Sequence, residues 1–171
     1  MLIGDKETFA IECYHDPLPS ETRRVFGRMC LWVGGNRLGD IDEPACMLNV
    51  TEVYLQGLLH RVESLDDPAL RSLDDREAFE FLDRALYLDD ARSNEQIAKD
   101  AERFSKFGLL TNGGESFDRT KSFIIGEADR LRVLFENDER GFSSARVGRA
   151  AFVLTVRGFL AWLVDEGKNA G

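Results

Sequence analysis

Histidine, the side chain most often used for acid–base catalysis near neutral pH, is almost absent from this chain. Only two of the 171 residues are histidines. His60 flanks the apolar stripe of a predicted helix and His15 lies in a proline-containing loop, and neither has a visible set of catalytic partners. The sequence therefore favours a binding role over histidine-dependent catalysis, and we assign no catalytic residue.

Cysteine is also scarce. The three cysteines, Cys13, Cys30 and Cys46, are odd in number and show no Cys-x-x-Cys spacing. This pattern indicates neither a zinc site nor a redox pair. We expect reduced cysteines in apolar surroundings, and we predict no bound metal and no cofactor.

Long apolar runs are missing as well. No stretch reaches the roughly 18 apolar residues that a membrane-spanning helix needs. Asp5, Lys6 and Glu7 interrupt the region in which an export signal would require a continuous apolar run. We therefore expect a cytoplasmic protein, and its length predicts one domain over residues 1–171.

Basic residues are outnumbered by acidic ones. The chain has 22 Lys and Arg against 31 Asp and Glu, which gives a net charge of −9. Binding to nucleic acid depends on basic side chains that neutralise phosphates, so this class of partner is disfavoured. A basic protein is the favoured partner.

The acidic excess is concentrated in residues 66–103, where twelve carboxylates stand against six Lys and Arg. Such a field can raise the association rate with a basic protein by about 10- to 1000-fold at low salt. A solvated helix surface is the simpler explanation of each pair, because carboxylates also favour helix starts. The candidate partner-binding acids are three adjacent pairs, Asp66 and Asp67, Asp74 and Asp75, and Asp89 and Asp90.

Apolar periodicity predicts an α+β fold. Alternating residues predict strands at 8–14, 28–33 and 37–41, and Gly34 and Gly35 are typical of the tight turn between the last two. Helical spacing then predicts three central helices. We expect capping boxes at their starts, formed by Asn49 with Glu52, Asp74 with Glu77, and Ser93 with Gln96, and we expect Gly108 to end the third helix.

The last third of the chain returns to strands. A meander is predicted at 121–125, 130–135 and 142–147, and the nearly continuous apolar segment 150–164 predicts a buried final helix. The predicted architecture is an antiparallel sheet, built from three N-terminal strands and a C-terminal meander, with three central helices and a C-terminal helix.

Tyr14 and Trp32 form a second candidate site for a partner. If Phe9 points inward, alternation places Tyr14 outward, and the next strand places Trp32 and Cys30 outward too. Tyr and Trp on an open sheet face are common binding anchors. The final helix could equally cover them, and the sequence does not decide between the two.

An enzyme is the alternative from a different class. Asp40 and Asp42, with one of the helical carboxylates, would suit a metal-dependent hydrolase. The segment 40–51 does not match a calcium loop, because Ala45 and Thr51 occupy the positions that need glycine and glutamate. A generic protein-interaction adaptor is the third possibility.

Several segments together resemble a known family. They are Ile3-Gly4-Asp5, Phe9-Ala10-Ile11-Glu12, the glycine hairpin with Leu38-Gly39-Asp40, and Phe159-Leu-Ala-Trp-Leu163 near the end. With the order of predicted elements, they resemble the immunity protein 42 family of bacterial polymorphic-toxin systems. The resemblance implies a small cytoplasmic protein that binds one toxin domain and neutralises it, with no catalytic residues. The acidic charge favours a basic toxin, such as a nuclease domain.

Overall fold

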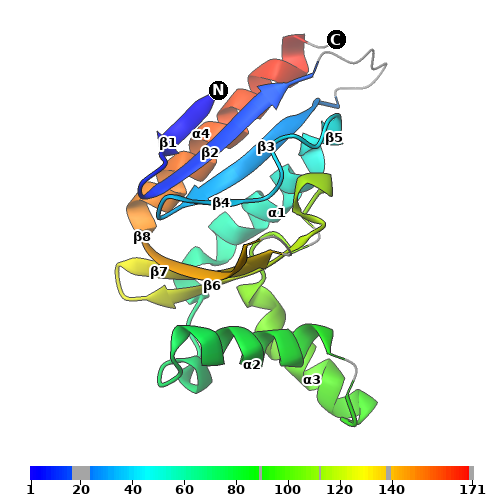
Figure 1. Cartoon of the computed structure of the whole chain (residues 1–171), viewed down its shortest axis with the longest axis vertical. Coiled ribbons are helices and arrows are strands. Elements are labelled where there is room, and N and C mark those ends of the chain that lie inside the picture. The colour runs from blue at the N-terminus through cyan, green and yellow to red at the C-terminus, as the bar shows by residue number, and fades with distance from the viewer. Residues whose placement is uncertain (17–23, 89, 112, 138–139, 170–171) are drawn as a thin grey trace.

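The computed structural model describes residues 1–16, 24–88, 90–111, 113–137 and 140–169. It confirms the α+β class and the predicted order of strands, central helices, strands and final helix. The strands are divided between two antiparallel sheets, one of five strands and one of three. The N-terminal sheet lies at one end of the molecule and the helices α2 (Asp75–Tyr87) and α3 (Asn94–Phe104) lie at the other (Figure 1).

The five-stranded sheet has the order β1-β2-β3-β4, and β5 pairs with β3 beyond the end of β4. Its strands are β1 (Leu2–Asp5), β2 (Phe9–His15), β3 (Phe26–Val33), β4 (Asn36–Leu38) and β5 (Cys46–Met47). Sequence reasoning missed β1 and β5. The first is short and begins at the chain end, and the second has two residues, so neither shows a period that could be recognised.

The glycine turn between β3 and β4 is as expected. Gly34 and Gly35 have φ values of 56° and 75°, in the left-handed region that a two-residue hairpin turn requires. A Cβ atom at Gly34 would lie 2.8 Å from the Cβ of Ala145 in the other sheet. The turn therefore lies close to β8 of the other sheet.

The first sheet buries one face against α4 (Arg149–Asn169) and α1 (Leu48–Arg61). Phe9 and Ile11 of β2 are inaccessible on this face, and the ring of Phe9 lies 4.9 Å from that of Phe152 in α4. The alternation predicted for β2 thus produces the core. In Figure 1 both helices lie behind the sheet, and no helix lies in front of it.

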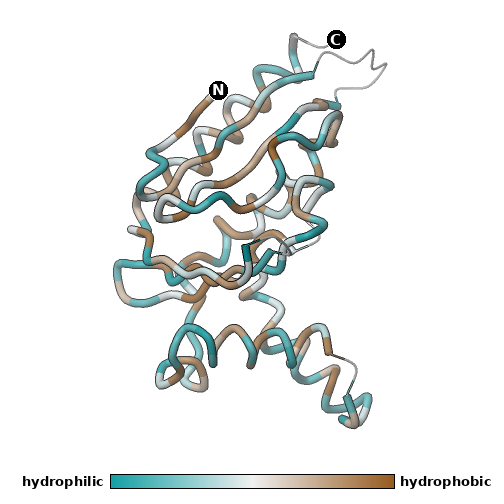
Figure 2. The backbone as a smooth tube through the Cα atoms, viewed as in Figure 1, coloured by the Kyte–Doolittle hydropathy of each residue, from teal (hydrophilic) through white to brown (hydrophobic). Residues whose placement is uncertain are grey.

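The second sheet is the meander β6 (Thr120–Glu127), β7 (Arg130–Asn137) and β8 (Gly141–Gly148). Residues 131–135 of β7 are all buried, so the central strand of this sheet is covered on both faces. Phe79 of α2 packs edge-on against Phe123 of β6 and Phe142 of β8. Figure 2 shows the corresponding hydrophobic residues along the strands of both sheets.

The predicted helix ends are correct in part. Asp74 and Glu77 form the reciprocal capping box of α2, and the Ser93 side chain accepts a hydrogen bond from Gln96 at the start of α3. The first predicted box is wrong, because α1 begins after Met47 without a side-chain cap. Asn49 instead accepts a hydrogen bond from the amide of Val25 and so ties α1 to the segment before β3.

Gly108 follows the end of the helical segment, as predicted, but it does not adopt the left-handed conformation typical of a glycine at that position. Its φ is −60°, and the helix continues as a short 3-10 turn, Ser105–Phe107. Gly108 then pairs with Phe123 in an isolated bridge to β6. Gly108 therefore connects the end of the helical segment to the second sheet.

Candidate interaction surface

The acids predicted to bind a partner are mostly engaged within the fold. Asp67 is 6% exposed and accepts two hydrogen bonds, at 2.8 and 2.6 Å, from the guanidinium of Arg103 in α3. Its neighbour Asp66 pairs with Arg71 at the surface. Hydrogen bonds from these arginines hold the pKa values of both carboxyl groups below their ordinary values.

The pair at the start of α2 fastens the helix. The Asp74 side chain caps the helix by accepting a hydrogen bond from the amide of Glu77. Asp75 accepts two hydrogen bonds from Arg146 and one from Ser144, both of which belong to β8. The two carboxylates therefore serve the helix and its attachment to the second sheet.

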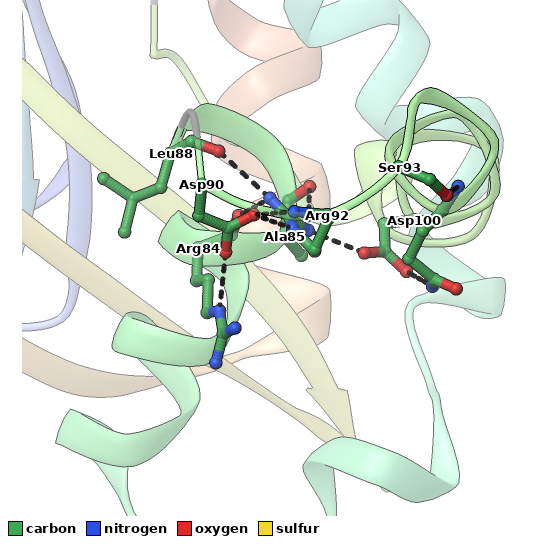
Figure 3. Close-up of polar contacts among 8 residues, drawn as sticks. Arg84, Ala85, Leu88, Asp90, Arg92, Ser93 and Asp100 are labelled. Carbon is green, nitrogen blue, oxygen red and sulfur yellow. Dashed lines mark hydrogen bonds and ion pairs between the residues drawn. The ribbon is translucent and has the colours of Figure 1, made fainter.

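The last pair belongs to the connection between α2 and α3, and Asp89 lies outside the described residues. Asp90 accepts hydrogen bonds from Arg84 at 3.0 Å and from Arg92 at 2.6 Å. Arg92 also donates to Asp100 at 2.6 Å and to the carbonyl oxygen of Leu88 (Figure 3). These bonds lower the pKa of Asp90 to about 2. Arg92 thus satisfies carbonyl groups at the end of α2 and joins it to α3.

Tyr14 and Trp32 lie where the alternation predicted, on the face opposite α4. The carboxylate of Glu12 joins them, because it accepts hydrogen bonds from the Tyr14 hydroxyl at 3.0 Å and from the Trp32 indole at 2.8 Å. Lys6 donates to the same carboxylate at 2.7 Å, and its ammonium lies 4.3 Å from the centre of the Trp32 ring. We call these four residues the outer-face cluster. No α-helix of the described chain covers them, so the alternative of a covering final helix is wrong.

The third outward residue, Cys30, is not available on this face. Its exposure is 0%, and burial raises the pKa of its thiol to about 12. Cys13 on the opposite face has a pKa raised to about 12 for the same reason. Both thiols are therefore protonated at neutral pH, as expected of core cysteines.

A hollow of about 440 Å³ adjoins the outer-face cluster. It lies between the segment after β4, the turn Glu115–Phe117 and the nearby ends of β6 and β7. Arg37 joins the two regions, since it pairs directly with Trp32 across β3 and β4 and also lines the hollow. Among the described residues, five exposed acids line the hollow: Asp40, Asp42, Glu43, Glu115 and Asp118.

The distribution of free charge differs from the one that the sequence indicated. None of the five acids in the hollow has an ion-pair partner among the described residues, whereas Asp66, Asp67, Asp75 and Asp90 all do. Sequence reasoning missed Glu115 and Asp118. They lie more than seventy positions after Asp40, and the backbone hydrogen bond from Asp40 to the Ser116 carbonyl, with the close packing of Gly39 on Phe117, brings the two segments together.

The arrangement of Asp40 and Asp42 does not support the hypothesis of a metal-dependent hydrolase. Within the described ranges, no group of three or more His, Cys, Asp or Glu side chains is arranged to hold a metal ion. Nδ1 of His15 lies 2.8 Å from Oε2 of Glu166 in α4, a contact that links β2 to the final helix. In the part of the chain that the structure describes, no helix is both long and apolar enough to cross a bilayer.

Comparison with known proteins identifies the fold and the family of the chain. No curated protein matches the chain. Among solved structures, the crystal structure of CdiI from Burkholderia dolosa AUO158 is similar, with a TM-score of 0.69 and 20% sequence identity over 95% of this chain and 99% of the other. This likeness shows a shared fold. The family model for immunity protein 42 matches residues 1–162, which is nearly the whole length, and the chain therefore belongs to the immunity protein 42 family.

Proposed function

We propose that this chain is an immunity protein that neutralises one cognate toxin domain by binding it in a stoichiometric, non-catalytic complex in the cytoplasm. The observation that carries the proposal is the family match over residues 1–162. An inhibitor of this kind needs a specific surface, commonly about 800 Å² on each partner, and requires neither a metal nor a catalytic histidine.

The charge of the chain supports a basic toxin. The net charge is −9, and the hollow beside the outer-face cluster holds five acids that form no ion pair with another described residue. A nuclease domain fits this description, because it must hold phosphates with Lys and Arg. The free acids would raise the rate of encounter, and Tyr14 and Trp32 supply side chains of the kind that anchor interfaces.

The ion-paired acids have a smaller part in this proposal. Asp67 and Asp75 hold arginines of their own chain, so a toxin would have to break those pairs before it could use them. We therefore propose that the acids of residues 66–103 contribute mainly to the overall negative field.

Co-expression with the toxin encoded next to this gene tests the proposal. We expect cells that make the toxin to survive only when this chain is present, and the two proteins to co-purify in equal amounts. A matched control is the same cell carrying an immunity protein of another toxin, which should not protect. If both proteins are folded and no complex forms at low salt, the proposal is wrong.

A further inference from the structure

We propose that the toxin docks on the outer-face cluster of the first sheet and places a basic segment in the adjoining hollow. This inference rests on the proposed function and assigns its interface. The surface combines an uncovered sheet face, aromatic side chains held in fixed positions, and a recess lined by carboxylates with no ion-pair partner in the described chain.

The sheet face is open because both covering helices lie on the other side. α4 packs on β1 and β2, and α1 packs on β3, all through the face that carries Phe9 and Ile11. Leu2 lies opposite Glu12 in the register and therefore belongs to the outer face, where it is 46% exposed. Tyr14 is 47% exposed. An apolar and aromatic surface is thus available beside charged groups.

The aromatic side chains are fixed before any partner arrives. Glu12 accepts hydrogen bonds from Trp32, Tyr14 and Lys6, and its pKa lies below the ordinary value chiefly because of the bond from Lys6. Side chains that are already ordered lose less conformational entropy on binding. This arrangement suits Tyr14 and Trp32 to the centre of an interface, where such residues contribute most.

The recess beside them is part of the folded framework. The amide of Asp40 donates a hydrogen bond of 2.7 Å to the Ser116 carbonyl, which fixes the segment after β4 against the turn before β6. Gly39 has a φ of 92°, and a Cβ atom there would lie 2.6 Å from the ring of Phe117. The close approach of these two segments holds acids from both on the same recess.

The charge of the recess indicates which kind of toxin segment would occupy it. In the part of the chain that the structure describes, the recess carries five carboxylates against three arginines, Arg37, Arg119 and Arg140. Because these carboxylates have no ion pairs within the described ranges, they present more attraction to an incoming cation than the paired acids of α2 and α3 do. A Lys- or Arg-bearing loop of the toxin is the complementary group, and acids beside that loop would meet the three arginines.

Binding of the purified toxin, measured by calorimetry, tests the recess. We expect Asp42→Lys, Glu43→Lys and Asp118→Lys combined in one protein to weaken binding by about 30-fold or more. The matched control combines Glu80→Lys, Glu95→Lys and Glu102→Lys on the exposed surface of α2 and α3, with the same change in net charge. We expect that control to bind within about threefold of the original chain.

The aromatic part of the surface is tested in the same way. Tyr14→Ala should weaken binding by about tenfold, and Tyr54→Ala, a tyrosine on α1 of similar exposure, should not. Hydrogen exchange of the unaltered complex adds a measurement that needs no variant. We expect slower exchange in residues 10–14, 30–32 and 40–43 on binding.

The outcomes separate the two proposals. If the unaltered chain does not bind the toxin, the proposed function fails. If it binds, but the recess variant and its control lose affinity equally, or if exchange slows only in α2 and α3, the function stands and this surface is wrong.

Discussion

Arginine partners determine what the acidic side chains of this protein do. Asp67 was expected to face a toxin, yet it is buried, caps the 3-10 turn Pro68–Leu70 through the amide of Ala69, and holds Arg103 with two hydrogen bonds. A carboxylate with this many donors is part of the fold. Its neighbour Asp66 has a single exposed partner.

Asp67 and Asp66 make a matched pair for a stability test. We expect Asp67→Ala to lower the free energy of unfolding by about 2 kcal/mol, because a turn cap and a bidentate bond are lost together. Asp66→Ala should have a much smaller effect, since water replaces the lost contact. Urea unfolding of the two variants measures the difference, and equal losses would contradict the structural role of Asp67.

Asp90 predicts a dependence of stability on pH. Its pKa in the folded protein is about 2, below the ordinary 3.8, mainly because Arg92 donates hydrogen bonds to it. A lowered pKa adds stability that is complete above pH 4 and is lost as the pH falls toward 2. In unfolding measurements across this range, Asp90→Asn should therefore show a shallower loss than the unaltered chain. An unchanged slope would be inconsistent with the ion pairs of Figure 3.

At the scale of elements, α2 and α3 form a helical pair attached to the second sheet by polar and aromatic contacts. Asp75 reaches β8 at the start of α2, Phe79 packs on β6 and β8, and Arg92 joins the end of α2 to α3. Asp75, which was predicted to bind a partner, thus connects one element of the fold to another.

The contribution of the α2 capping box to stability can be measured separately. Asp74→Ala should lower the free energy of unfolding by about 1 kcal/mol, because the Glu77 amide loses its acceptor. Glu80→Ala, in the middle of the same helix and exposed, should change it by less than about 0.5 kcal/mol. Thermal unfolding of both variants gives the comparison, and a neutral Asp74→Ala would argue against the cap.

For the whole molecule, the net charge of −9 and the acidic recess predict salt-sensitive association with the proposed toxin. The screening length shortens from about 30 Å at 0.01 M salt to about 3 Å at 1 M. We expect the association rate to fall by at least about tenfold between low and high salt, while the dissociation rate changes little. Stopped-flow mixing measures both rates. A salt-independent association rate would show that the toxin is not attracted by this field.

Local patterns determined much of the fold. The alternation of Phe9 and Ile11 predicted a half-buried strand, the Gly34-Gly35 turn predicted the hairpin, and Asp74 with Glu77 predicted the start of α2, because each depends on neighbouring residues only. The outward placement of Tyr14 and Trp32 followed from the same two-residue period. The very short strands β1 and β5 were not predicted, because so few residues show no recognisable alternation.

The tertiary structure alone decided which charges remain free. Asp67 pairs with Arg103 and Asp75 with Arg146 across long stretches of chain, so several acids of the segment that dominates the sequence are held in ion pairs within the fold. Asp40 and Asp118 meet at one recess only because the two sheets bring their segments together. Composition determined the sign and size of the charge. Its distribution depends on contacts between distant residues, which no local pattern contains.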